Sequence, residues 1–349
     1  MQLSGLGLAR RYHDEVVAPL LAARWPGLRY ACARLGSGSD VLALDDEMSR
    51  DHDWGLRLTL LVERSSTAAV DQHLERELPA EYRGWPTRFA TTWDPVVRHR
   101  VQVATAEDFV ASRLGVAVDR AWDAVDWLSL SGQSLLEVTA GEVFVDTFGA
   151  LGEIRERLAW YPGDVWRYVV AADWHRIGQE LPFVGRAGLR GDDLGSRVTT
   201  GHLVSVAMHL GFLLQRRWPP YSKWLGTMFA ELPDSGGAAP FLHAALAASN
   251  WQERQARLVD ALTAFNDIQR GAGLPVSDQV AEPFFDRPFV SVRPSVTAGL
   301  LQGVTDPLVR RLPPGVGSVE QWVDNVDVLT DPVRRTTVTQ AWRALLLSD

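Results

Sequence analysis

The segment from Gly36 to Asp53 carries side chains that could bind phosphate groups and divalent metal ions. Between positions 40 and 53 the only cation is Arg50, and the six carboxylates are those of Asp40, Asp45, Asp46, Glu47, Asp51 and Asp53. Carboxylates at this density repel one another, so keeping them ionised in a folded protein requires solvent, arginines or metal ions. A solvated acidic loop and a metal site are the two interpretations, and the flanking residues favour the metal site.

Asp51 and Asp53 stand at the start of a strand predicted to run to Val62. Because side chains alternate between the two faces of a strand, both carboxylates are expected on one face, which continues through Arg57 and Thr59. The opposite face is apolar and consists of Trp54, Leu56, Leu58 and Leu60. Magnesium prefers one or two protein carboxylates, with phosphate oxygens and waters completing its octahedron. Asp51 and Asp53 are therefore predicted to be catalytic metal ligands.

A small-residue turn precedes this pair. Residues 28–35 predict a strand, which runs directly into Gly36, Ser37, Gly38, Ser39 and Asp40. Glycine lets the backbone approach a phosphate closely, and the N–H groups and hydroxyls of such a turn can bind phosphate oxygens. We therefore predict that residues 36–40 bind a nucleotide, with the aspartate pair holding its metal ion.

The string GSGSDVLALDDEMSRDHDWG resembles the signature of the nucleotidyltransferase superfamily that includes the kanamycin and lincosamide nucleotidyltransferases. That signature is Gly-Ser, roughly ten residues, and then two acids separated by one residue. Here 11 residues separate Ser39 from Asp51, and 13 separate Ser37 from Asp51. The fuller string is also similar to a bacterial branch called domain of unknown function 4037. That second resemblance extends through YPGDVWRYVVAADW, FVGR and PPYSKWLG, and so over most of the chain.

The resemblance implies a fold and a reaction. It implies that Asp51 and Asp53 bind two Mg²⁺ ions and that Gly38-Ser39 or Gly36-Ser37 binds the triphosphate of ATP or another nucleoside triphosphate. The implied reaction moves a nucleoside monophosphate, AMP by expectation, to a hydroxyl of a small-molecule acceptor. A protein- or RNA-modifying nucleotidyltransferase is one alternative. A catalytically silent nucleotide-binding or regulatory protein of the same fold is the other.

Two departures from the family pattern affect this expectation. His52 separates the two aspartates, where the family usually has an apolar residue. The family also has a third carboxylate on a later strand, whereas the strand predicted over residues 97–103 contains no acid. Asp146, at the end of a hairpin predicted over residues 135–146, is the candidate for this third catalytic acid. Without such an acid, the site would bind a nucleotide and transfer nothing.

The chain is predicted to be α+β with two domains. Residues 1–150 form a nucleotidyltransferase-like domain with a mixed α/β sheet. Residues 151–349 carry apolar side chains at three- and four-residue spacing, which predicts a helical domain. The resemblance implies that this domain closes over the nucleotide and acceptor. The sequence DSGGAAP near position 234 predicts a loop within that domain.

The helical domain offers further candidates for binding the nucleotide. Lys223 is the only lysine in a chain whose lysines and arginines total 35, and Tyr221 beside it could present a flat surface to a base or sugar. Arg186 and Arg197 flank a Gly- and Asp-rich segment predicted to be a loop that closes over a ligand. Surface charge and interdomain packing are the alternative interpretations of these four residues.

Composition limits the partners and the compartment. The net charge of −8 and pI near 5.5 argue against nucleic acid as a partner, since nucleic-acid binders usually carry a basic face. No apolar run reaches the length of about 18 residues that a membrane span needs. The only cysteine, Cys32, cannot form an internal disulfide, and the charged amino terminus does not resemble a secretory leader. A cytoplasmic location follows, and the sequence leaves a homodimer open.

Overall fold

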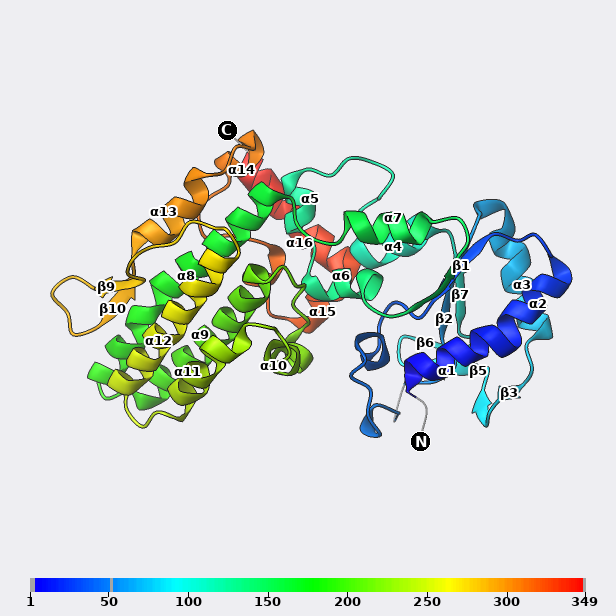
Figure 1. Ribbon diagram of the computed structural model, residues 1–349, viewed down its shortest axis with the longest axis horizontal. Coiled ribbons are helices and arrows are strands. Elements are labelled where there is room, and N and C mark those ends of the chain that lie inside the picture. The colour runs from blue at the N-terminus through cyan, green and yellow to red at the C-terminus, as the bar shows by residue number, and fades with distance from the viewer. Residues whose placement is uncertain (1–3, 51–52, 348–349) are drawn as a thin grey trace. The chain divides into compact units, whose positions relative to one another are not determined.

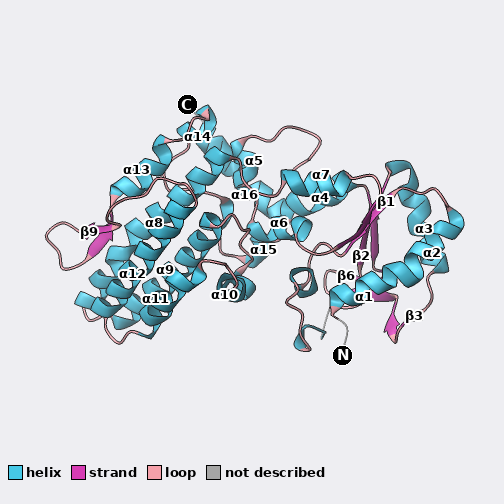
Figure 2. Ribbon diagram, viewed as in Figure 1, coloured by secondary structure: helices cyan, strands magenta, loops and turns pink. Residues whose placement is uncertain are grey.

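The computed structural model describes residues 4–50 and 53–347 and divides the chain into two compact units. The sheet unit contains residues 1–121 and 134–159, and the helical unit contains residues 122–133 and 160–349. Figure 2 shows that nearly all the strands lie in the first unit, while helices dominate the second. The predicted α+β class, with an N-terminal mixed sheet and a helical C-terminal region, is confirmed.

The observed division differs from the predicted boundary at residue 150 in two places. Residues 150–159 stay with the sheet unit because helix α7 (Ala150–Arg157) packs on strand β8 (Val143–Asp146). Residues 122–133 belong to the helical unit because helix α5 (Ala124–Leu128) packs on helix α8 (Gly163–Leu189).

The sheet has four strands in the order β7-β2-β1-β8. Besides β8, they are β1 (Tyr30–Ala33), β2 (Leu58–Val62) and β7 (Val101–Ala104). β1 is antiparallel to both β2 and β8, and β2 is parallel to β7, with Thr59 paired to Ala33 on one side and Gln102 on the other. All four strands therefore meet at the same end of the sheet, where β1 ends and β2, β7 and β8 begin.

Helices near the amino terminus cover one face of this sheet (Figure 1). α1 (Gly5–Tyr12), a π-helical turn (His13–Val17) and α2 (Ala18–Arg24) follow one another, and α3 (Thr67–Glu77) follows β2. The π turn ends two residues before Pro19, whose missing N–H removes one helical hydrogen bond. Together α1, the π turn and α2 form one continuous helical stretch from Gly5 to Arg24. Leu58 and Leu60 of β2 pack in this core, as the alternating pattern predicted.

Of the strands predicted in the sheet unit, one is interrupted and another is wrong. The strand predicted over residues 97–103 is broken at Arg100 into β6 (Asp94–His99), which pairs with β5 (Arg88–Thr91), and β7. The hairpin predicted over residues 135–146 is instead helix α6 (Gly132–Thr139) followed by β8. The remaining elements of this unit are β3 (Glu81–Tyr82), β4 (Trp85–Pro86), α4 (Ala106–Leu114) and three short 3₁₀ turns at Ser39–Leu42, Met48–Arg50 and Arg64–Ser66.

The helical unit is built around the long helices α8, α9 (Asp193–Leu214) and α12 (Trp251–Gly271), which pack on one another (Figure 1). Its other elements are α10 (Ser222–Ala230), α11 (Ser235–Ala247), the strand pair β9 (Ala281–Pro283) and β10 (Val290–Val292), α13 (Pro294–Gln302), α14 (Pro307–Arg311), a 3₁₀ turn (Val319–Gln321), α15 (Val326–Leu329) and α16 (Pro332–Leu347). The loop predicted near position 234 is wrong, because α11 begins there. Within residues 4–50 and 53–347, none of the helices is long and apolar enough to cross a membrane.

A buried polar chain crosses the core of the helical unit. His209 Nδ1 lies 2.7 Å from Asp173 Oδ2, and Nε2 lies 3.5 Å from Glu320 Oε1. Burial by itself would lower the pKa of His209, but the charges of Asp173 and Glu320 outweigh it and raise that pKa from 6.5 to about 10. His209 is therefore a cation held between two carboxylates at neutral pH.

The charged group of Asp173, His209 and Glu320 predicts that the stability of the protein depends on pH. Since the pKa of His209 is higher in the folded state, its contribution is complete below pH 6.5 and is lost as pH rises towards 10. Over that window the free energy of unfolding should fall by up to about 1.4 kcal/mol per pH unit relative to His209→Gln. Urea unfolding of both proteins at several pH values measures the difference. Parallel pH profiles for the two proteins would contradict the assignment.

Candidate functional site

The turn after β1 closes around a buried guanidinium. Arg34, 2% exposed, donates from Nε and Nη2 to the two carboxylate oxygens of Asp40 at 2.7 and 2.8 Å. Its Nη2 also donates to the carbonyl oxygen of Ser37 at 2.8 Å. Gly38 has a φ of 134°, and a Cβ there would lie 2.3 Å from Asp40 Oδ1. The close approach of this ion pair therefore requires glycine at position 38.

The turn leaves backbone donors available. Gly36 N–H donates to the carbonyl oxygen of Glu137 at 2.8 Å, whereas no described residue accepts a hydrogen bond from the N–H of Ser37, Gly38 or Ser39. Gly38 is exposed and the two serines are half-buried. Successive N–H groups of this kind are suited to bind an anion.

Asp53 lies beside this turn, but not in a strand. β2 begins at Leu58, so the predicted strand start is wrong, and Asp53 has a φ of 57° in the preceding segment. Its carboxylate accepts hydrogen bonds from Thr92 N–H at 2.7 Å and from the Thr92 hydroxyl. Asp51 and His52 lie outside the described residues. Asp53 is therefore the one member of the predicted pair whose position is defined.

Arg57 connects Asp53 to the turn. Its Nη1 donates to the carbonyl oxygen of Asp53 at 3.0 Å, and its Nη2 donates to Ser37 Oγ at 3.2 Å. The predicted nucleotide-binding turn and the predicted metal ligand thus share one guanidinium.

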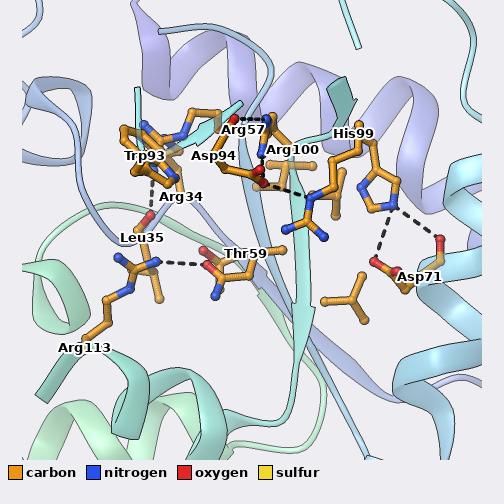
Figure 3. A pocket seen from close by; sticks show the side chains of 15 residues that line it. Arg34, Leu35, Arg57, Thr59, Asp71, Trp93, Asp94, His99, Arg100 and Arg113 are labelled. Carbon is orange, nitrogen blue, oxygen red and sulfur yellow. Dashed lines mark hydrogen bonds and ion pairs between the residues drawn. The ribbon is translucent and has the colours of Figure 1, made fainter. Parts of the chain in front are cut away.

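A basic cavity of about 410 Å³ opens next to these residues (Figure 3). Five arginines and two aspartates are among the residues that line it, namely Arg34, Arg57, Arg98, Arg100, Arg113, Asp71 and Asp94. Gly36, Ser37, Gly38 and Ser39 do not themselves line the cavity. They adjoin it, because Arg34 and Arg57 bond to Ser37 and the Arg113 guanidinium carbon would lie 3.4 Å from a Cβ on Gly36.

The cavity carries uncompensated positive charge at Arg57. Burial, together with the neighbouring charges of Arg34 and Arg113, lowers the pKa of Arg57 to about 9, although Asp40 and Asp53 act in the opposite direction. An arginine remains protonated at neutral pH even so. A bound anion would offset this repulsion, so the electrostatics favour an anionic ligand.

Most of this basic lining is not apparent from the sequence. The alternating pattern predicts Arg57 on the same face as Asp53 and Thr59, and both Arg57 and Thr59 do line the cavity. No local pattern assigns a role to Arg34 or Arg113. Arg34 stands two residues before Gly36, a position that could have indicated a contact with the turn. Arg113 comes from α4, and nothing in its local sequence indicates that it reaches the end of the sheet beside Gly36.

Two predicted site residues have other roles in the structure. Asp40 was predicted to bind the nucleotide, but it is 3% exposed and its carboxylate is engaged by Arg34. Asp146 was predicted to be the third catalytic acid, but it caps α7 by accepting from Gly149 N–H at 2.9 Å and Gly152 N–H at 3.0 Å. It pairs with Ala31, at the end of β1 away from the turn. Both carboxylates are therefore engaged in contacts within the protein.

No described residue takes the place of the third acid on the sheet. Gln102 on β7 is paired with Thr59 and lines the cavity, and it carries an amide. Of the two aspartates that line the cavity, Asp94 is bound by Arg98 at 3.2 Å and by Arg100 at 2.7 Å. A third carboxylate is therefore missing from the cavity face of the sheet within the described part of the chain.

The remaining candidates belong to the helical unit. Lys223 is exposed on α10, with Nζ 4.8 Å from the Trp224 ring centre, and Tyr221 precedes that helix. Arg186 is exposed on α8, and Arg197 on α9 pairs with Asp193 at 2.7 Å. The predicted loop between these two arginines is a tight turn over residues 190–192, because α8 continues to Leu189 and α9 begins at Asp193. The structure thus places none of the four in the unit that contains Asp53.

Comparisons with known proteins add a partial family match. The family described as Domain of unknown function (DUF4037) matches residues 127–225, a range that does not include Gly36–Asp53. No curated protein matches the chain. A crystal structure described as a nucleotidyltransferase-like protein from Exiguobacterium sibiricum has 12% identity and a TM-score of 0.32, over 75% of this chain and 74% of that one. A likeness this distant does not define the activity of the present chain.

Proposed function

We propose that the sheet unit binds the triphosphate of a nucleoside triphosphate with Mg²⁺, and that the protein transfers a nucleoside monophosphate, AMP by preference, to a hydroxyl of a small-molecule acceptor. The observation that carries the proposal is the five-arginine cavity beside the Gly36–Ser39 turn, with Asp53 joined to that turn through Arg57. A triphosphate carries the negative charge that such a cavity lacks.

The residues present fit a magnesium ion that binds together with the nucleotide. Within residues 4–50 and 53–347, no group of three or more His, Cys, Asp or Glu side chains could hold a metal ion alone. Magnesium commonly uses only one or two protein carboxylates and takes its remaining ligands from phosphate and water. Each oxygen of Asp53 accepts one hydrogen bond from Thr92 and keeps a lone pair. Asp53, with Asp51 from the sequence pair, would hold the ion.

In this proposal the protein's own residues orient the phosphates and offset their charge. Arg57 and Arg113 offset the charge of the phosphates, and the N–H groups of the turn orient them. Thr92 fixes the Asp53 carboxylate. Bound Mg²⁺ would polarise the α-phosphorus and lower the pKa of the attacking hydroxyl. Trp93, 55% exposed with Arg57 4.8 Å from its ring centre, offers an aromatic face at the cavity for a nucleobase.

A catalytically silent nucleotide-binding protein is the second candidate function. Gln102, at the place on β7 beside Thr59, favours it, because an amide cannot accept a proton as a third carboxylate would. Binding of the triphosphate is common to both candidates, and only the fate of the nucleotide separates them.

Titration calorimetry with ATP, GTP, CTP and UTP tests the binding step. At least one triphosphate should bind in a Mg²⁺-dependent manner, and Asp53→Asn should weaken that binding by about tenfold or more, since it removes a charged ligand. Asp46→Asn is the matched control, because Asp46 lies in the same acidic segment and its carboxylate accepts hydrogen bonds from Ser49. Binding that is absent, or equal in wild type and Asp53→Asn, would refute the proposal.

An α-labelled triphosphate incubated with a cell lysate tests the transfer step. Label on a small metabolite supports the proposed acceptor class, and label on protein or RNA supports the alternative acceptors. Triphosphate binding without pyrophosphate release would assign the silent function.

A further inference from the structure

A two-residue turn at the tip of the β5–β6 hairpin contacts both the candidate metal ligand and the basic cavity. The turn consists of Thr92 and Trp93, which are both exposed, and the pairing of Thr91 with Asp94 closes it. Asp94 N–H donates to Thr91 Oγ1 at 3.2 Å. Because a hairpin loop of two residues allows few backbone conformations, the positions of Thr92 and Trp93 depend on each other.

Arg100 supports the base of this turn. Its Nη1 donates to Asp94 Oδ2 at 2.7 Å, and its Nη2 donates to the carbonyl oxygens of Asp94 and Val96 at 3.0 and 2.6 Å. The Arg100 side chain is 8% exposed, and Figure 3 shows it beside Asp94 at the cavity. The tip of the hairpin is therefore held in a defined position next to the cavity.

Thr92 orients the carboxylate of Asp53. Asp53 lies in the loop before β2 with a φ of 57°, so no strand neighbour fixes its side chain. Thr92 N–H donates to Oδ1 at 2.7 Å, and the Thr92 hydroxyl donates to Oδ2. Two donors from one residue set the plane of the carboxylate and leave a lone pair on each oxygen for a cation. The position of Thr92 therefore determines where a metal ion on Asp53 would lie.

Trp93 faces the groups expected to bind the phosphates. Its ring lines the cavity, and the Arg57 guanidinium lies 4.8 Å from the ring centre (Figure 3). Arg57 in turn donates to Ser37 Oγ at 3.2 Å. A nucleobase stacked on the exposed part of this ring would contact the residue next to the one that holds Asp53.

We propose that this turn couples recognition of the nucleobase to metal binding at Asp53, with Trp93 as the base contact and Thr92 as the positioning residue. The inference rests on the function proposed above. Inorganic tripolyphosphate carries the charge that the arginines attract, but it has no base to place on Trp93. The site consequently selects nucleoside triphosphates over inorganic polyphosphates, and Mg²⁺ increases this selectivity.

Titration calorimetry with the preferred nucleoside triphosphate and with tripolyphosphate, each in Mg²⁺ and in EDTA, tests the coupling. In the wild type, Mg²⁺ should strengthen nucleotide binding at least about fivefold more than tripolyphosphate binding, after correction for the Mg²⁺ affinity of each free ligand. Thr92→Val keeps the N–H bond to Asp53 and loses the hydroxyl bond, so this difference should fall below about twofold. Thr92→Ser restores the hydroxyl and should restore the difference.

Two further variants separate the coupling from a general disturbance of the hairpin. Trp93→Leu should remove the difference while leaving tripolyphosphate binding unchanged. Val97→Ala, on the same hairpin, 66% exposed and outside the cavity lining, should keep the difference.

The possible outcomes distinguish this inference from the proposed function. Equal strengthening of both ligands by Mg²⁺, or a difference that survives Thr92→Val, would overturn the coupling, whereas Mg²⁺-dependent nucleotide binding would still support the proposed function. If neither ligand binds the wild type, the proposed function fails and the coupling fails with it.

Discussion

Asp40→Asn is expected to lower the free energy of unfolding of the sheet unit by about 3–5 kcal/mol. Asp40 accepts two hydrogen bonds from Arg34, and the side chains are 5% and 2% exposed. Removing the carboxylate charge leaves a guanidinium buried with only carbonyl oxygens as partners, and an uncompensated buried charge is costly. Because Arg34 also bonds to Ser37, the Gly36–Ser39 turn should lose its order in the same variant.

Urea unfolding of two further variants distinguishes this effect from a general loss of charge. Asp108→Asn removes an exposed ion pair with Arg64 in the same unit and should leave the free energy of unfolding nearly unchanged, because solvent screens exposed pairs. The double variant Arg34→Met/Asp40→Leu replaces the pair with apolar side chains and should recover most of the loss. A small effect of Asp40→Asn, or a double variant no more stable than the single one, would show that the pair does not hold the turn.

The sequence identified the elements around the site better than the site itself. The sequence predicted strands over residues 28–35 and from Asp51 to Val62, and the observed neighbours β1 and β2 lie within these two ranges. Both predictions rest on local signals, the alternation and the composition of the segments. The Gly-Ser turn was likewise local, since its glycines adopt left-handed conformations that few other residues tolerate. The strand predicted to begin near Asp53 was too long, because polar residues at alternating positions can also occupy a loop.

The side-chain partners could not be read from the same signals. Asp40 looked like part of an acidic metal site, and only the three-dimensional structure brings Arg34 to it. Asp146 followed an apolar strand as a catalytic acid would, yet its position on β8 relative to β1 depends on an antiparallel pairing that the sequence did not specify. Arg113 reaches the turn from α4. Long-range pairing of this kind is a property of the fold, not of any single segment.

Arg57→Met is expected to weaken triphosphate binding without lowering the free energy of unfolding. The neighbouring cations Arg34 and Arg113, together with burial, disfavour the charge of Arg57 in the free protein. An apolar side chain of similar length should therefore leave the free energy of unfolding unchanged or raise it. In contrast, triphosphate affinity should fall by about 100-fold, or about 2.8 kcal/mol, because the phosphates lose a buried charged donor.

Calorimetry with Mg²⁺ and the preferred triphosphate, together with urea unfolding, measures the two effects side by side. Arg98→Met is the matched control, since Arg98 lines the same cavity but its side chain is 60% exposed, and solvent screening should limit its effect to a few-fold. If Arg57→Met lost stability and affinity in parallel, Arg57 would be a structural cation that ties Asp53 to the turn. A more stable protein that no longer binds the triphosphate is the result expected of a residue kept for its ligand, because a charge that destabilises the empty fold is useful only when an anion neutralises it.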